Sequence, residues 1–184
     1  MLRNVIIRYI KEKDIKDILR IADIQLGQGY LDAGKVVDMV EGNSPLRCLV
    51  ATLNDEVIGF CSYEVFTHAQ MFEYIQSEVP LFKNEERIGY IRSLASAPHS
   101  AKKGLGSALI AQVVACFYKM GIYHMFAGAW KPGDNINAGK TLEKNGFKKY
   151  KEVKNYYLKE SLNTEFICPY CGETCYCSVV FYIR

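Results

Sequence analysis

Apolar and polar positions along this chain follow two different periods. Short runs rich in β-branched and aromatic residues predict strands, because such side chains suit a pleated, half-buried surface. Apolar residues spaced three and four positions apart instead predict amphipathic helices. The predicted strands are Asn4–Ile10, Leu46–Leu53, Glu56–Phe66, Ile88–Ala97, Ile122–Trp130, Phe147–Leu158 and Ser178–Arg184. The predicted helices are 15–26, with Asp14 as its cap, then Ala33–Glu41, 105–120 and Asn135–Asn145.

The order of these elements, β-α-α-β-β-β-α-β-α-β-β, predicts the fold class. Asn54-Asp55 is a tight turn between two strands, so they form an antiparallel hairpin. Two strand-helix units follow in the second half of the chain. We therefore expect a mixed α/β fold with a central, mostly antiparallel sheet and helices on both faces. The 184 residues predict one domain over 1–184, with a cysteine-rich loop at 163–177 before the last strand.

One long connection, Thr67–Glu86, has no clear period. His68, Met71 and Phe72 indicate a helical turn or two, and Pro80 interrupts the pattern. Long irregular connections in a compact domain are often functional. The segment is interpreted either as such a site or as a packed surface excursion.

Glycines mark the start of the third predicted helix. Gly104-Leu105-Gly106 lies between the strand Ile88–Ala97 and an amphipathic stretch that includes Leu109 and Val113. A strand, a glycine-rich turn and a helix together aim main-chain N–H groups and the positive helix end at an anion, usually a phosphate. An ordinary helix entry explains the same glycines equally well.

Composition narrows the class of protein. Apolar residues make up 49% of the chain and charged residues 23%, as in soluble globular proteins. The net charge of +3 and the absence of a basic stripe argue against nucleic-acid binding, including by a zinc ribbon. No apolar run approaches the ~18 to 20 residues that span a membrane. The first residues do not resemble a secretion signal, so the sequence predicts a cytoplasmic protein with no membrane partner.

Seven cysteines are present, and four of them lie within ten residues: Cys168, Cys171, Cys175 and Cys177. The pattern Cys-Pro-Tyr-Cys-Gly has the form of a zinc knuckle, and the other two cysteines would complete a four-sulfur structural zinc site. Sulfurs two residues apart in a strand are roughly 6.5 Å apart, whereas sulfurs on one zinc are about 3.8 Å apart. The chain must therefore bend here, and the last strand must begin after Cys177. A disulfide, free thiols and redox chemistry are the alternatives.

Three features in their order resemble the GNAT superfamily, the acyl-CoA-dependent N-acetyltransferases. They are the strand Ile88–Ala97 followed by Pro98, the loop 101–106, and Asn135-Ile-Asn-Ala138 followed by Glu143-Lys-Asn-Gly-Phe147. The resemblance extends over Asn4–Arg184. It implies acetyl transfer to a primary amine, with acetyl-CoA as cosubstrate.

The resemblance also implies which residues bind acetyl-CoA. The loop and helix start would hold the pyrophosphate, and the strand before them would pair with the pantetheine arm. The matching positions are Leu94, Ala95, Ser96, Ala101, Lys102, Lys103, Gly104, Leu105, Gly106, Ser107 and Asn135. Ala101 stands where the family usually has Gln or Arg, so one phosphate contact is missing, for which Lys102 and Lys103 can compensate. Leu142 replaces a tyrosine that often protonates the leaving thiolate.

Direct attack of a neutral amine on the thioester, in a ternary complex, needs a polarised carbonyl and a proton acceptor. A strand N–H near Ala95 is the expected oxyanion donor. Glu64, Tyr90 and His124 are the candidate catalytic residues, because they lie on strands near the expected cleft. Each is also open to a purely structural interpretation.

The alternative function, which Leu142 favours, is a catalytically weak acyl-CoA-binding sensor or regulatory module. The amine acceptor is not identifiable from the sequence, and a homodimer is left open. We expect zinc, bound by four thiolates with no free position, to shape the acceptor site and not to perform catalysis.

Overall fold

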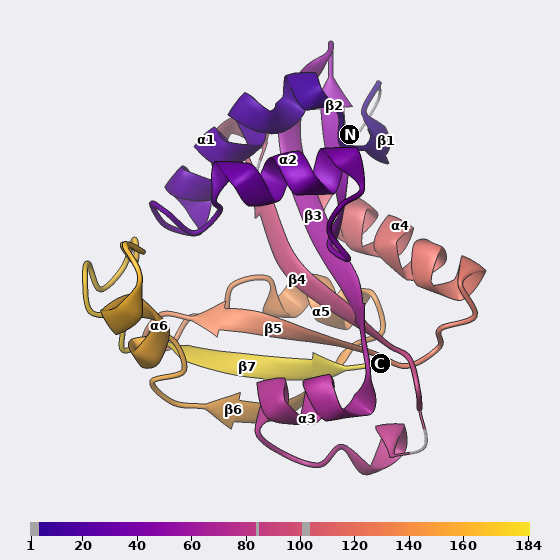
Figure 1. Ribbon diagram of the computed structural model, residues 1–184, viewed down its shortest axis with the longest axis vertical. Coiled ribbons are helices and arrows are strands. Elements are labelled where there is room, and N and C mark those ends of the chain that lie inside the picture. Colours follow the sequence, from indigo (N-terminus) through magenta and orange to yellow (C-terminus); the bar gives the residue numbers. More distant parts are fainter. Residues whose placement is uncertain (1–3, 84, 101–103) are drawn as a thin grey trace.

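The computed structural model describes residues 4–83, 85–100 and 104–184, and seven strands in one sheet form its centre (Figure 1). The strand order is β1-β2-β3-β4-β5-β7-β6. All neighbours are antiparallel except β4 and β5, which are parallel. The predicted mixed, mostly antiparallel sheet is confirmed. The strands are β1 (Ile6–Tyr9), β2 (Arg47–Leu53), β3 (Glu56–Phe66), β4 (Ile88–Ser96), β5 (Met125–Lys131), β6 (Lys148–Val153) and β7 (Ser178–Ile183).

Helices cover both faces of the sheet. Alternate residues of β2 and β3 separate the two cores: Leu49 and Cys61 pack toward α4, while Val50 and Phe60 pack toward α1 and α2. Figure 1 shows α1 and α2 crossing in front of the upper strands, with α4 on the other side. The helices are α1 (Ile15–Gln25), α2 (Ala33–Glu41), α3 (His68–Ile75), α4 (Leu105–Lys119), α5 (Gly139–Lys144) and α6 (Leu158–Asn163).

Three predicted elements differ from the structure. The helix expected over Asn135–Asn145 begins only at Gly139, because Ala138 has a left-handed φ of +62°. The strand expected over Phe147–Leu158 ends at Val153; a turn containing Asn155, at φ +53°, then leads into α6. The irregular connection holds α3 and a short 3-10 helix at Pro80–Phe82. Met71 and Phe82 are fully buried, so this excursion is packed against the sheet.

Asp14 does not cap α1 through its side chain as predicted. Its carboxylate instead accepts two hydrogen bonds from Arg8, at 2.6 and 2.9 Å, and one from the N–H of Lys11 at 2.8 Å. The side chain of Asp14 is 2% exposed. This ion pair ties the start of α1 to strand β1.

A bulge in β4 opens the sheet. Tyr63 of β3 pairs with Ile91, and Ser62 pairs with Ser93, so Arg92 is an extra residue between them. Strand β5 pairs with β4 only over Gly89–Ile91. Beyond the bulge the two parallel strands separate. None of the described helices is long and apolar enough to cross a membrane.

Candidate functional site

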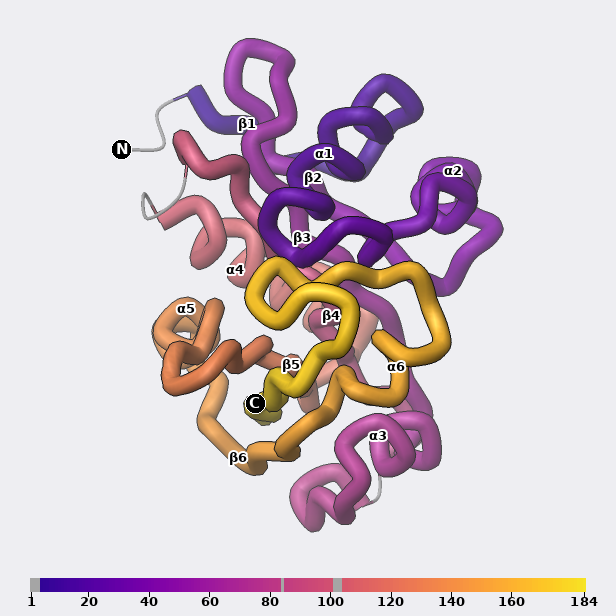
Figure 2. Tube along the Cα trace, turned by 90° about the vertical axis from the view of Figure 1, so that its left-hand side faces the viewer, coloured from indigo at the N-terminus to yellow at the C-terminus, as the bar shows by residue number. Residues whose placement is uncertain are grey.

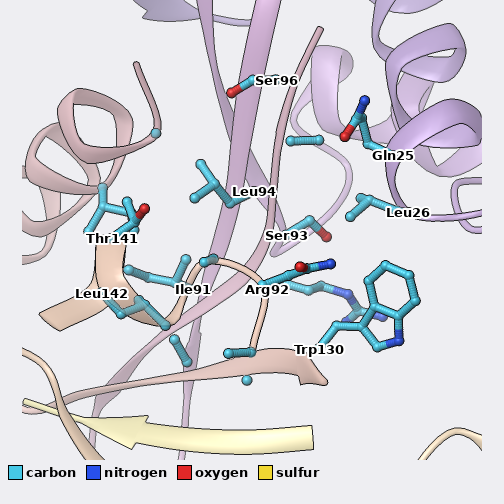
Figure 3. Close-up of a pocket in the computed structure, with 18 of the residues that line it drawn as sticks. Gln25, Leu26, Ile91, Arg92, Ser93, Leu94, Ser96, Trp130, Thr141 and Leu142 are labelled. Carbon is cyan, nitrogen blue, oxygen red and sulfur yellow. The ribbon is translucent and has the colours of Figure 1, made fainter. Parts of the chain in front are cut away.

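A cavity of about 520 Å³ fills the gap where β4 and β5 separate. Figure 3 shows its wall, with Leu94 and Ser96 on one strand, Thr141 and Leu142 from α5, and Gln25 and Leu26 from the end of α1. The two ends of the cavity differ in chemistry. Gly104–Ser107 lines one end, and a group of aromatic side chains lines the other.

The glycine end of the cavity has the geometry of an anion site. Gly104 precedes α4 with a φ of +83°, a conformation that favours glycine. Leu105, Gly106 and Ser107 are the first residues of this 15-residue helix and line the cavity, so the positive end of the helix dipole lies at the cavity wall. The predicted contacts Ala101, Lys102 and Lys103 lie outside the described residues. The geometry fits the phosphate-binding role expected of Gly104–Ser107.

The main chain of β4 determines which N–H groups face the cavity. The N–H of Ala97 donates to the oxygen of Ile58 at 2.9 Å, so it points toward β3. Alternation in an antiparallel pair turns the N–H of Ala95 the same way. The N–H groups of Leu94 and Ser96 therefore face the cavity. The N–H of Ala95 itself is therefore not available to an oxyanion in the cavity, whereas those of Leu94 and Ser96 are.

Asn135 does not lie on the cavity wall, whereas Asn137 does. The Nδ2 group of Asn135 donates to Oδ1 of Asn137 at 2.7 Å, so Asn135 reaches the cavity only through its neighbour. Leu142 is buried against the core and lines the cavity. It offers no hydroxyl group to a leaving thiolate.

Aromatic residues from four segments line the other end of the cavity: Tyr30, Trp130, Tyr157 and Phe166. The hydroxyl groups of Tyr30 and Ser93 form a hydrogen bond of 2.9 Å. Burial raises the pKa of Tyr30 and of Tyr157, so both hydroxyls stay neutral at physiological pH. This end can enclose an apolar or aromatic group of an acceptor.

None of the three candidate catalytic side chains lies on the cavity wall. Tyr90 is 3% exposed and stacks on Phe126 at 4.4 Å, and burial raises its pKa well above the ordinary value. His124 precedes β5, at the end away from the cavity, and pairs with Glu85 at 2.9 Å. This placement does not support the roles predicted for Tyr90 and His124.

Glu64 reaches the cavity indirectly. Its Oε1 atom accepts a hydrogen bond of 3.0 Å from Nη1 of Arg92, which does line the cavity. Figure 3 shows Arg92 extending toward Trp130. We did not predict Arg92 as a site residue. The sequence did contain a signal for it, because Arg92 is a charged residue within the otherwise apolar run of β4.

The four clustered cysteines lie together as the sequence predicts. Their sulfur atoms are all within 4.8 Å of one another, with 3.9 Å between Cys168 and Cys177 and 3.4 Å between Cys171 and Cys177. Main-chain hydrogen bonds of 2.9 Å join Cys168 and Gly172 in both directions, and Gly172 has a φ of +85°. Strand β7 begins at Ser178, which confirms that the last strand starts after Cys177.

A family model supplies the deciding comparison. The model of the acetyltransferase (GNAT) family matches residues 15–147, which include the cavity walls from α1, β4, α4, β5 and α5. This chain belongs to the GNAT acetyltransferase family. It is therefore an N-acetyltransferase that takes the acetyl group from acetyl-CoA, and the sensor alternative is not favoured. The cysteine cluster of this acetyltransferase lies outside the matched residues.

Solved structures share the fold of this acetyltransferase at low sequence identity. NAA60 of Arabidopsis thaliana, solved with a bisubstrate analogue, is 16% identical with a TM-score of 0.72, over 98% of this chain and 97% of that one. The ribosomal-protein-alanine N-acetyltransferase of Brucella melitensis is 17% identical with a TM-score of 0.64, over 97% and 98%. The protein yncA of Salmonella typhimurium, solved with acetyl-CoA, is 16% identical with a TM-score of 0.65, over 98% of this chain and 93% of that one. No curated protein sequence matches.

The contact between α4 and β4 gives a test of the acetyl-CoA binding expected at the glycine end of the cavity. A Cβ atom at Gly106 would lie 3.3 Å from Leu94 and 3.5 Å from Thr141, both of which line the cavity. We expect Gly106→Val to raise the Kd for acetyl-CoA roughly tenfold, since overpacking costs about 1 to 3 kcal/mol. Calorimetry measures this Kd. The matched control is Ala111→Val, because Ala111 is exposed on the same helix. An unchanged Kd in folded Gly106→Val would contradict this assignment.

Proposed function

We propose that this acetyltransferase acetylates a primary amine by direct attack in a ternary complex. The cavity between the separated strands carries the proposal, because one continuous space joins the glycine end to the aromatic end. Acetyl-CoA would place its pyrophosphate at Gly104–Ser107 and its pantetheine arm along Leu94 and Ser96. The acceptor would enter from the aromatic end. Binding both reactants side by side lowers the entropic part of the barrier.

The proposed acetyl transfer proceeds in the following bond changes, assisted by groups that line the cavity. The amine nitrogen attacks the thioester carbonyl carbon, a C–N bond forms and the C–S bond breaks, and CoA leaves as a thiolate. The N–H of Leu94, which faces the cavity, would stabilise the oxyanion. No carboxylate or imidazole is found among the described residues that line the cavity. The proton of the amine would therefore pass to water, and the acceptor would bind as the free base.

This route predicts a simple pH profile. We expect kcat/KM to rise with a slope of about one on logarithmic axes until the pKa of the acceptor amine, and then to level off. The variant His124→Gln should keep that shape, because His124 is held by Glu85 away from the cavity. A break in the profile that disappears in His124→Gln would instead make this histidine the general base.

A screen of amines tests the proposed function. Purified protein is incubated with acetyl-CoA and a panel of amino acids, polyamines, aminoglycosides and peptides with a free N-terminus. Released CoA thiol and a product 42 Da heavier than the acceptor, roughly the mass of one added acetyl group, are expected for at least one amine class. A protein that binds acetyl-CoA but acetylates none of them would overturn the proposed transfer.

We also propose that Cys168, Cys171, Cys175 and Cys177 bind one structural zinc ion. The sulfur separations of 3.4 and 3.9 Å are close to the roughly 3.8 Å expected between thiolates on one tetrahedral zinc. The N–H of Cys171 points at the sulfur of Cys168 at 3.4 Å, which suits a negatively charged thiolate. Four thiolates complete the coordination, so the metal would have no catalytic position. Such a thiolate site persists in a reducing compartment, which supports a cytoplasmic location.

A further inference from the structure

The cysteine segment, residues 164–177, contacts a distant part of the chain. The N–H of Ile167 donates to the main-chain oxygen of Gln28 at 2.9 Å, and the two residues form an isolated antiparallel bridge. Gln28 belongs to the loop that joins α1 to α2. Figure 2 shows the yellow cysteine segment passing beside this indigo part of the chain. The segment therefore joins the second half of the fold to the first.

This contact is close because two glycines face the cysteine segment. A Cβ atom at Gly27 would lie 2.5 Å from the ring of Phe166 and 2.6 Å from the oxygen of Ile167. One at Gly29 would lie 3.2 Å from the oxygen of Glu165. Both glycines have a positive φ. Main chain thus packs directly on main chain, and the ring of Phe166 meets that of Tyr30 edge-on at 6.3 Å.

The other end of the segment is held by the cysteines. Trp130, Tyr157 and Phe166 pack against the buried sulfur cluster. The N–H of Cys175 donates to the hydroxyl of Ser161 in α6 at 2.9 Å. Beyond two isolated bridges the segment has no regular secondary structure. Ordering so many residues costs roughly 1 to 2 kcal/mol each, which a metal crosslink offsets better than these few contacts.

The same residues form the aromatic wall of the cavity. Phe166 and Cys175 come from the cysteine segment, Tyr30 comes from the α1–α2 loop, and all three line the cavity. The glycine end, at Gly104–Ser107, takes no residue from the segment. The metal cluster, the aromatic wall and the α1–α2 loop are thus connected through Phe166, and the acetyl-CoA end is independent of them.

We propose that zinc controls acceptor binding by fixing the α1–α2 loop through the cysteine segment. This inference rests on the proposed zinc site and on the proposed acetyl transfer. With zinc bound, Phe166 and Ile167 hold Gly27–Tyr30 in place and complete the acceptor half of the cavity. Without zinc the segment and the loop lose their mutual contact. Acetyl-CoA binds equally well in both states.

Amide hydrogen exchange on the purified 184-residue chain tests this coupling without knowledge of the acceptor. Zinc removal by a chelator should speed exchange in residues 164–177 and also in 27–31, while 105–119 stays protected. The Kd for acetyl-CoA, measured by calorimetry, should change less than about twofold. Fluorescence of Trp130, the single tryptophan, should shift as the cluster opens. Unchanged exchange in 27–31 would overturn the proposal, as would an acetyl-CoA affinity that falls with zinc loss.

A substitution in the loop separates the contact from the metal. Gly27→Ala should keep one zinc per chain but displace Phe166, and lower kcat/KM for the acceptor found in the amine screen by about tenfold or more. Gly42→Ala is the matched control, because Gly42 also has a positive φ, +78°, but nothing within 4 Å of an added Cβ. Equal effects of the two variants would overturn the coupling. Absence of zinc from the wild type would refute the metal site, and absence of any acetylated amine would refute the transfer.

Discussion

Replacing Cys168 by serine is expected to remove the bound metal and to lower the free energy of unfolding by about 4 kcal/mol or more. Few single substitutions lower the free energy of unfolding this much, and those that remove a structural metal are among them. The serine hydroxyl is a much poorer zinc ligand than a thiolate, and the three remaining sulfurs cannot complete the tetrahedron. The zinc content measured by elemental analysis should fall from one ion per chain toward none. Thermal denaturation should show a matching loss of stability.

Cys116→Ser provides the control for this experiment. Cys116 is half-buried at α4, outside the cluster, and is expected to keep full zinc content. A wild-type protein that contains no zinc, together with a Cys168→Ser variant of normal stability, would eliminate the metal site. The cluster would then be interpreted as free thiols.

Substituting Asp14 by asparagine is expected to destabilise the fold by about 3 kcal/mol, because it leaves the charge of Arg8 without its partner. The side chains of Arg8 and Asp14 are 20% and 2% exposed, so solvent screens the pair little. The start of α1 should loosen with it. Chemical denaturation measures the loss of stability. Asp55→Asn is the control, since its ion pair with Lys13 is exposed, and an effect within about 0.5 kcal/mol is expected.

Acid should also destabilise the wild-type protein, because it protonates Asp14 and so weakens the ion pair with Arg8. Burial alone would raise the pKa of Asp14, but the hydrogen bonds from Arg8 and from the N–H of Lys11 outweigh it and hold the pKa below its ordinary value. A carboxylate with a lowered folded-state pKa stabilises the fold fully above its unfolded-state pKa, roughly 3.9. That stabilisation is lost as the pH falls through the folded-state pKa. The wild-type advantage over Asp14→Asn should therefore shrink below about pH 4; an advantage that persists undiminished there would contradict this account.

The strands and long helices could be predicted because their signals are local. Leu109, Val113 and Phe117 recur along one face of α4, and the hairpin at Asn54-Asp55 needs only its own turn residues. Short helices are different. Residues 158–163 carry too few apolar positions to show a period, and α6 forms only where its neighbours pack on it. Asn135–Asn145 has helix-forming residues, but the left-handed turn at Ala138 delays the start of α5.

Within the cavity, the residues of the glycine end could be predicted from the sequence and those of the aromatic end could not. Gly104–Ser107 is one contiguous segment, and a glycine turn followed by the start of a helix indicates an anion-binding site directly from the sequence. The aromatic wall combines Tyr30, Trp130, Tyr157 and Phe166, which come from four separate segments. The placement of Glu64, Tyr90 and His124 also depends on neighbours in the folded chain. Strand membership alone does not give access to a cavity.

The sequence by itself determined the element order, the glycine loop, the resemblance to the acetyltransferases and the clustering of four cysteines. Each of these features depends on residues that are close together in the sequence, because turn residues and the spacing of apolar side chains act over a few positions. Only the tertiary structure decided where β4 and β5 separate and which residues enclose the aromatic end of the cavity. It also decided that the cysteine segment packs on Gly27 and Gln28. Such contacts join residues more than a hundred positions apart, and they follow from the packing of the whole core.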